Sequence, residues 1–382
     1  MAKDLSPSTH PLTPPLTEEV WLSWLRLLRS RRVGVSTFFR LLNQYGSAEA
    51  ALDALPGIAA EAGVGNYRVC DVKSVRDEWN RARLAGARPI AFGAPDYPAR
   101  LAEIPDPPPI LWSLGDPDLL ARPVVALVGA RNASSLGTRM ARKLAGELGE
   151  AGYVVVSGLA RGVDTAAHLA ALETGTIAVL AGGVDVVYPA ENAVLAQEIQ
   201  DKGLRISERP VGTVAQARDF PRRNRIVSGV AQAVIVIEAA AKSGSLITAR
   251  TALDQGRDVM AVPGHPFDAR AAGTNILIRD GATLVRRASD VIEALATPEP
   301  VAKPAPQTAS VRADAARPDT QELHRRILDR LGPSPIPEDL LIRDIGISAA
   351  RASAEIATLE IEGMIRRDPG GLLSCVATGR SD

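Results

Sequence analysis

Short apolar runs alternate with amphipathic segments through the middle of the chain. The apolar runs cover residues 124–128, 153–156, 177–180, 233–237 and 259–262. Segments with helical periodicity lie between them, at 137–151, 166–173, 192–202 and 246–255. Parallel strands are buried on both faces, so they are near-continuous apolar runs, and helices connect them. The pattern therefore predicts a doubly wound α/β domain with a mainly parallel sheet over residues 122–296.

Helical periodicity also covers the region before the sheet. Apolar residues at 20–28 have helical spacing, and shorter helices are expected at 38–42 and 48–55, with breaks at Gly46 and at Pro56-Gly57. This pattern predicts a helical domain at 18–88. It follows a Pro/Ser/Thr-rich leader at 1–17 that we expect to be disordered. Residues 89–121 are rich in proline and are expected to form a connector with one short strand at 110–112.

The last part of the chain has a different pattern. Residues 297–318 are rich in Pro and Ala and predict a linker. Helical patterns at 323–331, 339–344 and 349–362 then precede two β-like runs, at 364–367 and 372–376. This order predicts a winged helix-turn-helix over 319–378. Its expected recognition helix carries Glu355, Glu360 and Glu362 beside Arg351, which favours protein contact or weak DNA binding over sequence-specific reading of a duplex.

Glycine-rich turns follow three of the apolar runs, at 129–135, 157–162 and 242–248. Each precedes a helical pattern. The unpaired N–H groups and the dipole at a helix start favour an anion. Because the carboxyl ends of parallel strands face one crevice, the three turns are expected to form a row of phosphate sites. The sequence thus predicts a nucleotide-type fold used as a groove for nucleic acid.

Basic side chains accompany these turns. Arg131 and Arg161 lie in the first two, and Arg222-Arg-Asn-Arg225 follows Phe220-Pro221. Arginine can bind phosphate through two hydrogen bonds, although a salt bridge to a neighbouring carboxylate is the alternative. Phe220 is a candidate for stacking on a base, with packing in the core as an equal alternative.

The composition and the absence of certain motifs exclude several classes of function. Lys+Arg and Asp+Glu are both 44, so any nucleic-acid binding must come from local clustering. No Walker lysine motif occurs, the four histidines lack metal-ligand spacing, and the two cysteines match no metal or redox motif. We therefore expect no cofactor, no metal and no enzyme activity. A chain without a signal peptide or a bilayer-length apolar run is expected to be cytoplasmic, with no membrane contact.

Several short motifs, taken in order, resemble the DNA-processing protein A family (DprA, also called Smf). They are Val-Gly-Ala-Arg at 128–131, Ser-Gly-Leu-Ala-Arg-Gly-Val-Asp at 157–164, Gly-Gly-Val-Asp-Val-Val-Tyr-Pro-Ala-Glu-Asn at 182–192, Phe-Pro-Arg-Arg-Asn-Arg-Ile at 220–226, Ser-Gly-Ser-Leu-Ile-Thr-Ala at 243–249 and Val-Pro-Gly at 262–264. The resemblance spans the whole sheet domain, which it implies is Rossmann-like. The flanking regions resemble members with a sterile-alpha-motif-like (SAM-like) N-terminal domain and a C-terminal winged helix.

The resemblance implies a bacterial protein that binds single-stranded DNA without strict sequence preference. It would protect incoming strands in natural transformation, load the RecA recombinase, and dimerise through the late part of the Rossmann-like domain, at 265–278. The implied contacts to single-stranded DNA are Arg131, Ser134, Gly158, Arg161, Phe220, Arg222, Arg223 and Asn224, with Lys242 and Ser243 as weaker additions.

Two other interpretations remain open. Nucleotide phosphoribohydrolases share this type of sheet, but their motif has a catalytic glutamate that the nearest segments, at 182–188 and 243–249, do not supply. A transcription regulator would read duplex DNA with the winged helix, and the acidic recognition helix disfavours that role.

Overall fold

The structure, a computed structural model, describes residues 13–296, 320–331, 336–345, 349–368 and 372–375. The chain divides into two compact units, Met1–Glu299 and Pro300–Asp382, which are described separately. Residues 1–12 of the expected leader and the whole expected linker at 297–318 lie outside the described residues. No helix in the described ranges is both long enough and apolar enough to span a membrane.

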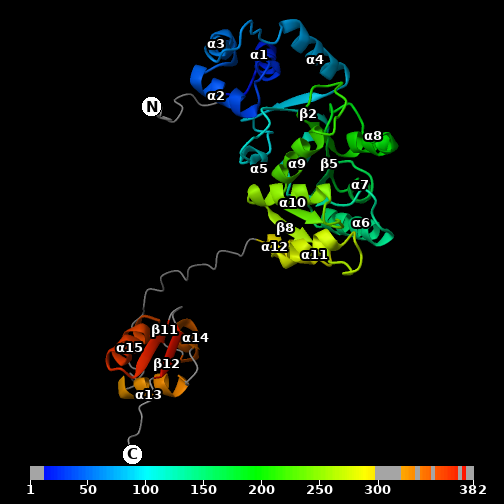
Figure 1. Cartoon of the computed structure of the whole chain (residues 1–382). Helices are drawn as coiled ribbons and strands as arrows, with labels where there is room; N and C mark the ends of the chain where they lie inside the picture. The colour runs from blue at the N-terminus through cyan, green and yellow to red at the C-terminus, as the bar shows by residue number, and fades with distance from the viewer. Residues whose placement is uncertain (1–12, 297–319, 332–335, 346–348, 369–371, 376–382) are drawn as a thin grey trace, which may run out of the picture. The chain divides into compact units, whose positions relative to one another are not determined.

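Four helices form the N-terminal part of the first unit (Figure 1). They are α1 (Glu18–Arg29), α2 (Val35–Tyr45), α3 (Ala48–Glu61) and α4 (Val72–Leu84). Gly46, with a φ of +78°, ends α2 as predicted. The predicted break at Pro56-Gly57 is wrong, because α3 continues to Glu61. The apolar face formed by Leu52, Leu55 and Ala59 is buried on both sides of the proline, and this packing outweighs the missing backbone hydrogen bond.

The proline-rich segment expected to be a connector is part of the central sheet. It contributes α5 (Ala99–Ala102) and two antiparallel strands, β1 (Arg88–Ala91) and β2 (Ile110–Gly115). β2 then pairs with β6 (Leu204–Ser207), again antiparallel. Leu111 and Trp112 are buried, so this strand is covered like the rest of the sheet. Six of the prolines, at 95, 98, 105 and 107–109, lie in the loop between the two strands, and Pro89 lies in β1, at the edge of the sheet where a proline is tolerated.

Seven parallel strands form the rest of a nine-stranded sheet, in the order β6-β5-β4-β3-β7-β8-β9. Besides β6 they are β3 (Val124–Val128), β4 (Val154–Ser157), β5 (Thr176–Val179), β7 (Ala233–Val236), β8 (Asp258–Ala261) and β9 (Thr283–Leu284). This topology confirms the doubly wound, Rossmann-like prediction.

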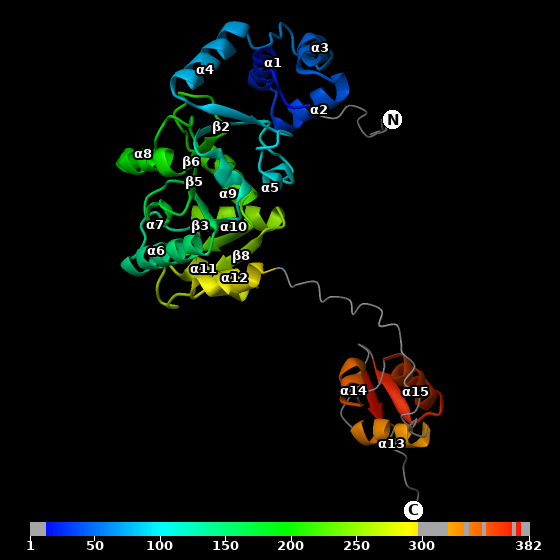
Figure 2. The ribbon, with the colours of Figure 1, turned by 180° about the vertical axis from the view of Figure 1, so that it is seen from behind.

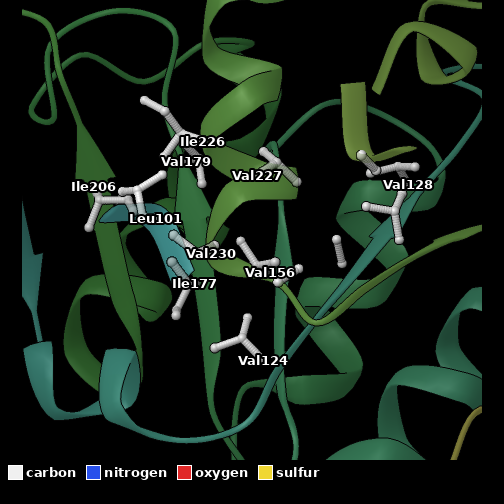
Figure 3. Close-up of a cluster of buried hydrophobic side chains, with 14 of the residues drawn as sticks. Leu101, Val124, Val128, Val156, Ile177, Val179, Ile206, Ile226, Val227 and Val230 are labelled. Atoms are coloured by element: carbon white, nitrogen blue, oxygen red, sulfur yellow. The ribbon is translucent and has the colours of Figure 1, made fainter. Parts of the chain in front are cut away.

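Helices cover both faces of the sheet, as Figures 1 and 2 show from opposite sides. One face packs against α9 (Asp219–Val230) and α10 (Gly244–Asp254), and the other against α6 (Ser135–Glu150) and α7 (Val163–Ala171). Further helices are α8 (Ala193–Lys202), α11 (Ala272–Arg279) and α12 (Ala288–Leu295). Alternate residues of β3 point to opposite cores: Val124 lies in one and Val125 in the other. Figure 3 shows the first core, where Val124 and Ile177 lie near Val230 of α9.

The second unit is a winged helix. Its elements are α13 (Thr320–Arg330), β10 (Ile336–Pro337), α14 (Glu338–Ile345), α15 (Ala349–Ile361), β11 (Ile365–Asp368) and β12 (Leu372–Cys375). The strands form a small sheet in the order β10-β12-β11. In α15, the expected recognition helix, Glu355 lies 2.7 Å from His324 Nε2 of α13, so this acidic group is engaged inside the domain.

Candidate nucleic-acid interface

The strand order of the sheet reverses between β3 and β7. From β3 the chain adds β4, β5 and β6 toward one edge, and from β7 it adds β8 and β9 toward the other. A cleft of about 570 Å³ lies at this switch point, lined by residues 128–132 after β3, residues 240–248 after β7, and one face of α9. Open α/β sheets bind their ligands in this position. The topology therefore places the candidate site on the first and third glycine-rich turns.

The predicted residues of helix α9 lie on two different faces of the helix. Phe220, Arg223 and Asn224 have helical spacing and line the cleft. Arg222 instead lines a separate pocket of about 650 Å³, beside the start of α2. Six of the ten predicted residues line the cleft: Arg131, Phe220, Arg223, Asn224, Lys242 and Ser243. Gly158 and Arg161 lie next to it, in a small pocket shared with Arg131, and Ser134 lines a different pocket against α6.

The second turn already binds a carboxyl group of the chain. The buried Asp164 carboxylate accepts hydrogen bonds from the N–H groups of Gly158, at 3.1 Å, and Ala160, at 3.3 Å. Burial raises the pKa of this carboxyl, and nearby Arg223 acts in the opposite direction. We expected this turn to be open to an external phosphate; the structure places a side chain in that position.

The first turn is occupied in the same way, by Glu238 from the end of β7. Its Oε2 accepts a hydrogen bond from Ser134 N–H at 2.8 Å, at the start of α6. The Ser134 hydroxyl caps the helix by accepting from Gly137 N–H at 2.9 Å. Arg270 Nε lies 3.7 Å from the other Glu238 oxygen. Ser134 and Gly158 remain predicted DNA contacts, but the amides of both are engaged within the protein.

The third turn differs from the other two. The Ser243 hydroxyl caps α10 by accepting from Ser245 N–H at 3.3 Å, and Lys242 is exposed beside it. Within the described part of the chain no carboxylate binds this turn. The positive end of α10 therefore faces the cleft without an internal counter-charge.

Arg223 combines burial, charge and unused hydrogen-bonding capacity. The residue is 7% exposed, its guanidinium packs on Gly158, and it lines both the cleft and the small pocket beside it. Burial lowers its pKa to about 10, against the opposing effect of Asp164, so it stays charged at neutral pH. Among the described residues its Nε has no hydrogen-bond partner. A buried cation in this state favours an anionic ligand in the cleft.

Two aromatic rings lie beside Arg131 at the edge of the cleft. The guanidinium carbon of Arg131 is 5.2 Å from the centre of the Phe220 ring, a cation–π distance. The Tyr188 ring is 5.6 Å from the Phe220 ring and tilted by 58°. Sequence reasoning did not select Tyr188, although a tyrosine in a loop after a predicted strand was a usable signal. Arg161 forms an exposed ion pair with Glu191, at 3.6 Å.

The second turn is held in shape by a buried network. Leu159 adopts a φ of +56°, its N–H donates to His168 Nε2 at 3.4 Å, and its carbonyl accepts from Asn192 Nδ2 at 2.9 Å. The other ring nitrogen of His168 donates to Thr176 Oγ1 at 2.7 Å, and that hydroxyl donates to Val155 O. Burial lowers the pKa of His168 to about 3, so the imidazole is neutral and supports the turn.

Family models match all three parts of the chain. The model described as DNA recombination-mediator protein A matches residues 88–296. A DprA-like N-terminal HHH (helix-hairpin-helix) domain matches residues 18–81, and a DprA winged helix domain matches residues 311–371.

Individual relatives agree with these matches. Protein Smf of Synechocystis sp. is 32% identical and covers 92% of this chain and 96% of its own. DNA processing protein DprA of Bacillus subtilis is 42% identical over 56% of this chain and 73% of its own. The DprA structure from Streptococcus pneumoniae has a TM-score of 0.60, is 35% identical and covers 71% of this chain and 97% of its own. A structure of Helicobacter pylori DprA, described by its single-stranded DNA binding mode, has a TM-score of 0.51, is 32% identical and covers 55% of this chain and 95% of its own. The chain therefore belongs to the DNA processing protein A family (DprA/Smf).

Proposed function

We propose that this protein binds single-stranded DNA in the cleft between β3 and β7, without sequence preference, and acts in DNA processing during transformation. The observation that carries the proposal is Arg223: a buried, charged guanidinium with an unpartnered Nε at the wall of a cleft. A backbone phosphate in the cleft would offer a negatively charged acceptor to this guanidinium, which lines the cleft. The similarity to the Helicobacter pylori protein, whose structure is described by its single-stranded DNA binding, supports the same ligand.

Other groups in the cleft fit a phosphate chain. Arg131 and Lys242 are exposed cations on opposite sides of it, and the start of α10 adds backbone N–H donors. These groups recognise the backbone, which has the same structure at every nucleotide, so they give affinity without reading bases. A recessed guanidinium is also reached more easily by one flexible strand than by a rigid duplex.

The cleft is proposed as a binding site and not as a catalytic site. Asp164 is the one carboxylate among the residues that line it, and two backbone N–H groups already bind this side chain. A phosphoribohydrolase needs a carboxylate directed at the sugar. An assay for free base released from nucleoside monophosphates tests this alternative, and release that depends on Asp164 would overturn the proposal.

The cellular role follows as part of the same proposal. By covering backbone phosphates the protein would protect incoming DNA in the cytoplasm and present it to RecA for loading. We further propose a homodimer through residues 265–278 of the Rossmann-like domain. Phe267, in this segment, is 95% exposed, and α11 adds the partly exposed Ile276. A homodimer through this segment would bury both side chains, which favours association.

The decisive experiment is fluorescence anisotropy with a labelled dT oligomer and with a duplex, across a salt series. We expect a strong preference for the single strand. Arg131→Ala should weaken binding and lower the slope of log K against log[salt] by about 0.7, the value for one lost phosphate contact. Arg250→Ala is the matched control, because Arg250 is exposed on α10 but does not line the cleft. An unchanged slope in folded Arg131→Ala protein would refute the cleft assignment.

A further inference from the structure

The aromatic pair at the edge of the cleft offers two rings to a base, and they are not equivalent. Phe220 is partly buried, and Arg131 lies over its ring at 5.2 Å. Tyr188 is 51% exposed and also contacts Phe220, at a ring-centre distance of 5.6 Å. The Phe220 ring therefore contacts both a guanidinium and a second ring, whereas half of the Tyr188 surface is exposed.

The position of Tyr188 relative to the phosphate-binding groups is set by the sheet. It lies in the loop after β5, Arg131 follows β3, and Lys242 follows β7. In the order β5-β4-β3-β7, these strands span three inter-strand spacings, about 14 Å in total. This width fits a few nucleotides of an extended strand. A single DNA strand whose phosphates contact Lys242 after β7 and Arg131 after β3 would therefore bring its following bases to Tyr188 after β5.

We propose that Tyr188 stacks on a base of the bound single strand, and that Phe220 is a positioning residue that holds both the Tyr188 ring and Arg131. This inference rests on the proposed function and deepens it, by adding a base-binding subsite to a phosphate-binding cleft. The small pocket here is lined by Tyr188 and Phe220 together with Arg131, Arg161 and Arg223. Cations thus surround the ring, as the phosphates flanking a stacked base require.

Two features support a role beyond packing. A tyrosine that served the core would be buried, and half of Tyr188 is exposed. Arg161 also lines this pocket, and among the described residues its one ion pair is an exposed contact with Glu191 at 3.6 Å, which contributes little free energy. Its guanidinium can therefore exchange Glu191 for a phosphate. Stacking on an aromatic ring tolerates any base, so the subsite is compatible with binding that lacks sequence preference.

The test compares a dT oligomer with an abasic oligomer of the same length, which has the phosphates but no bases. The full-length chain is used. Tyr188→Ala should weaken dT binding about fivefold or more, the low end of the effect of one lost base–aromatic stack, and leave abasic binding unchanged. Tyr188→Phe should bind both oligomers like the wild type. Arg131→Ala should weaken binding of both, because it removes a phosphate contact.

The possible failures are distinguishable. If the wild type binds neither oligomer, the proposed function itself fails. If the wild type binds dT and abasic oligomers equally, or if Tyr188→Ala weakens both by the same factor, phosphate binding stands and stacking by Tyr188 is refuted. Tyr188→Trp gives a second measurement in case the alanine variant does not fold. Its fluorescence should be quenched by dT beyond the change in the wild type, and not by the abasic oligomer; equal responses would overturn the inference.

Discussion

The guanidinium of Arg223 packs so closely on the Cα of Gly158 that a Cβ at position 158 would overlap with it. The backbone of Gly158 is outside the left-handed region, so this contact alone opposes an alanine there, and the guanidinium must move to admit one. We predict that Gly158→Ala displaces Arg223, lowers the free energy of unfolding by about 1–3 kcal/mol, the usual cost of overpacking, and weakens binding of single-stranded DNA. Chemical denaturation and anisotropy measure the two effects.

Gly146→Ala is the matched control for that substitution. Gly146 lies inside α6, where an added Cβ would meet no atom within 4 Å, so alanine should raise stability by up to about 1 kcal/mol through helix propensity. DNA affinity should stay at the wild-type value. If Gly158→Ala binds DNA like the wild type, the position of Arg223 does not matter for the ligand.

Glu238 carries the second prediction, because its carboxylate binds the start of α6 through Ser134 N–H. Glu238→Ala leaves this donor without its partner, and we expect a loss of about 1–3 kcal/mol of stability. The vacated helix start should then accept a free anion. Sulfate should therefore raise the melting temperature of Glu238→Ala more than that of the wild type, at equal ionic strength.

The control for this prediction is Glu173→Ala, which breaks an exposed ion pair with Lys202 away from the cleft. Its stability should stay within about 0.5 kcal/mol of the wild type, and sulfate should act on it as on the wild type. An equal sulfate response of Glu238→Ala and the wild type would show that Glu238 does not occupy an anion site.

The anion sites show which part of the interface the sequence could predict. Three glycine-rich turns at strand ends were visible as patterns, since local chain geometry determines them. The side chains that occupy these turns could not be predicted from such patterns. Glu238, for example, is 104 positions from Ser134 in the sequence and reaches it only because β3 pairs with β7. In the same way, Arg222 and Arg223 are neighbours in sequence but line different pockets, because the orientation of α9 directs them to different sides of the helix.

The fold was predictable where strands are continuous apolar runs buried on both faces, as in β3, β4, β5, β7 and β8. β6 was missed, because the buried Arg205 interrupts its apolar pattern. The sheet edge formed by β1 was missed because its proline and its antiparallel pairing with β2 depend on tertiary contacts. Tyr188 has no periodic signal at all, and its proximity to Phe220 could be recognised only in three dimensions.

Arg222 carries the third prediction. It lies across Pro221 from the cleft, and Pro221 lines both the cleft and the second pocket. A phosphate reaches Arg222 only if the strand continues beyond the cleft. We therefore expect Arg222→Ala to weaken binding of a dT oligomer of about 16 nucleotides and to leave one of about 4 unaffected, the two limits of typical site sizes. Arg131→Ala should weaken both, and an equal effect of the two variants on the short oligomer would contradict the separation of the two pockets.

The fourth prediction concerns the proposed dimer. Phe267→Arg places a charge on a fully exposed ring within 265–278 and should convert the protein to a monomer, measured by light scattering across a concentration series. Leu253→Arg is the control, because Leu253 is an exposed apolar residue of α10 outside that segment. A Phe267→Arg protein that remains dimeric would move the interface elsewhere.

The last prediction is a pH dependence caused by His168. Burial lowers its pKa to about 3 in the folded protein, whereas an unfolded histidine titrates at about 6.5. Between these values the unfolded chain binds a proton that the folded chain does not. Stability should therefore be complete above pH 6.5 and fall as the pH drops below it, with this one group contributing up to about 1.4 kcal/mol per pH unit.

The measurement is the free energy of unfolding between about pH 5 and 7, where carboxyl groups with ordinary pKa values change little. The buried Asp164, whose pKa is raised, is present in both proteins compared, so its contribution cancels. His168→Gln removes the titrating group, so its stability should be lower at pH 7 but should decrease less steeply toward pH 5. If His168→Gln and the wild type have the same slope, His168 takes up its proton in the folded protein as readily as in the unfolded chain, and the hydrogen bond from Leu159 N–H to its Nε2 cannot be what holds the second turn.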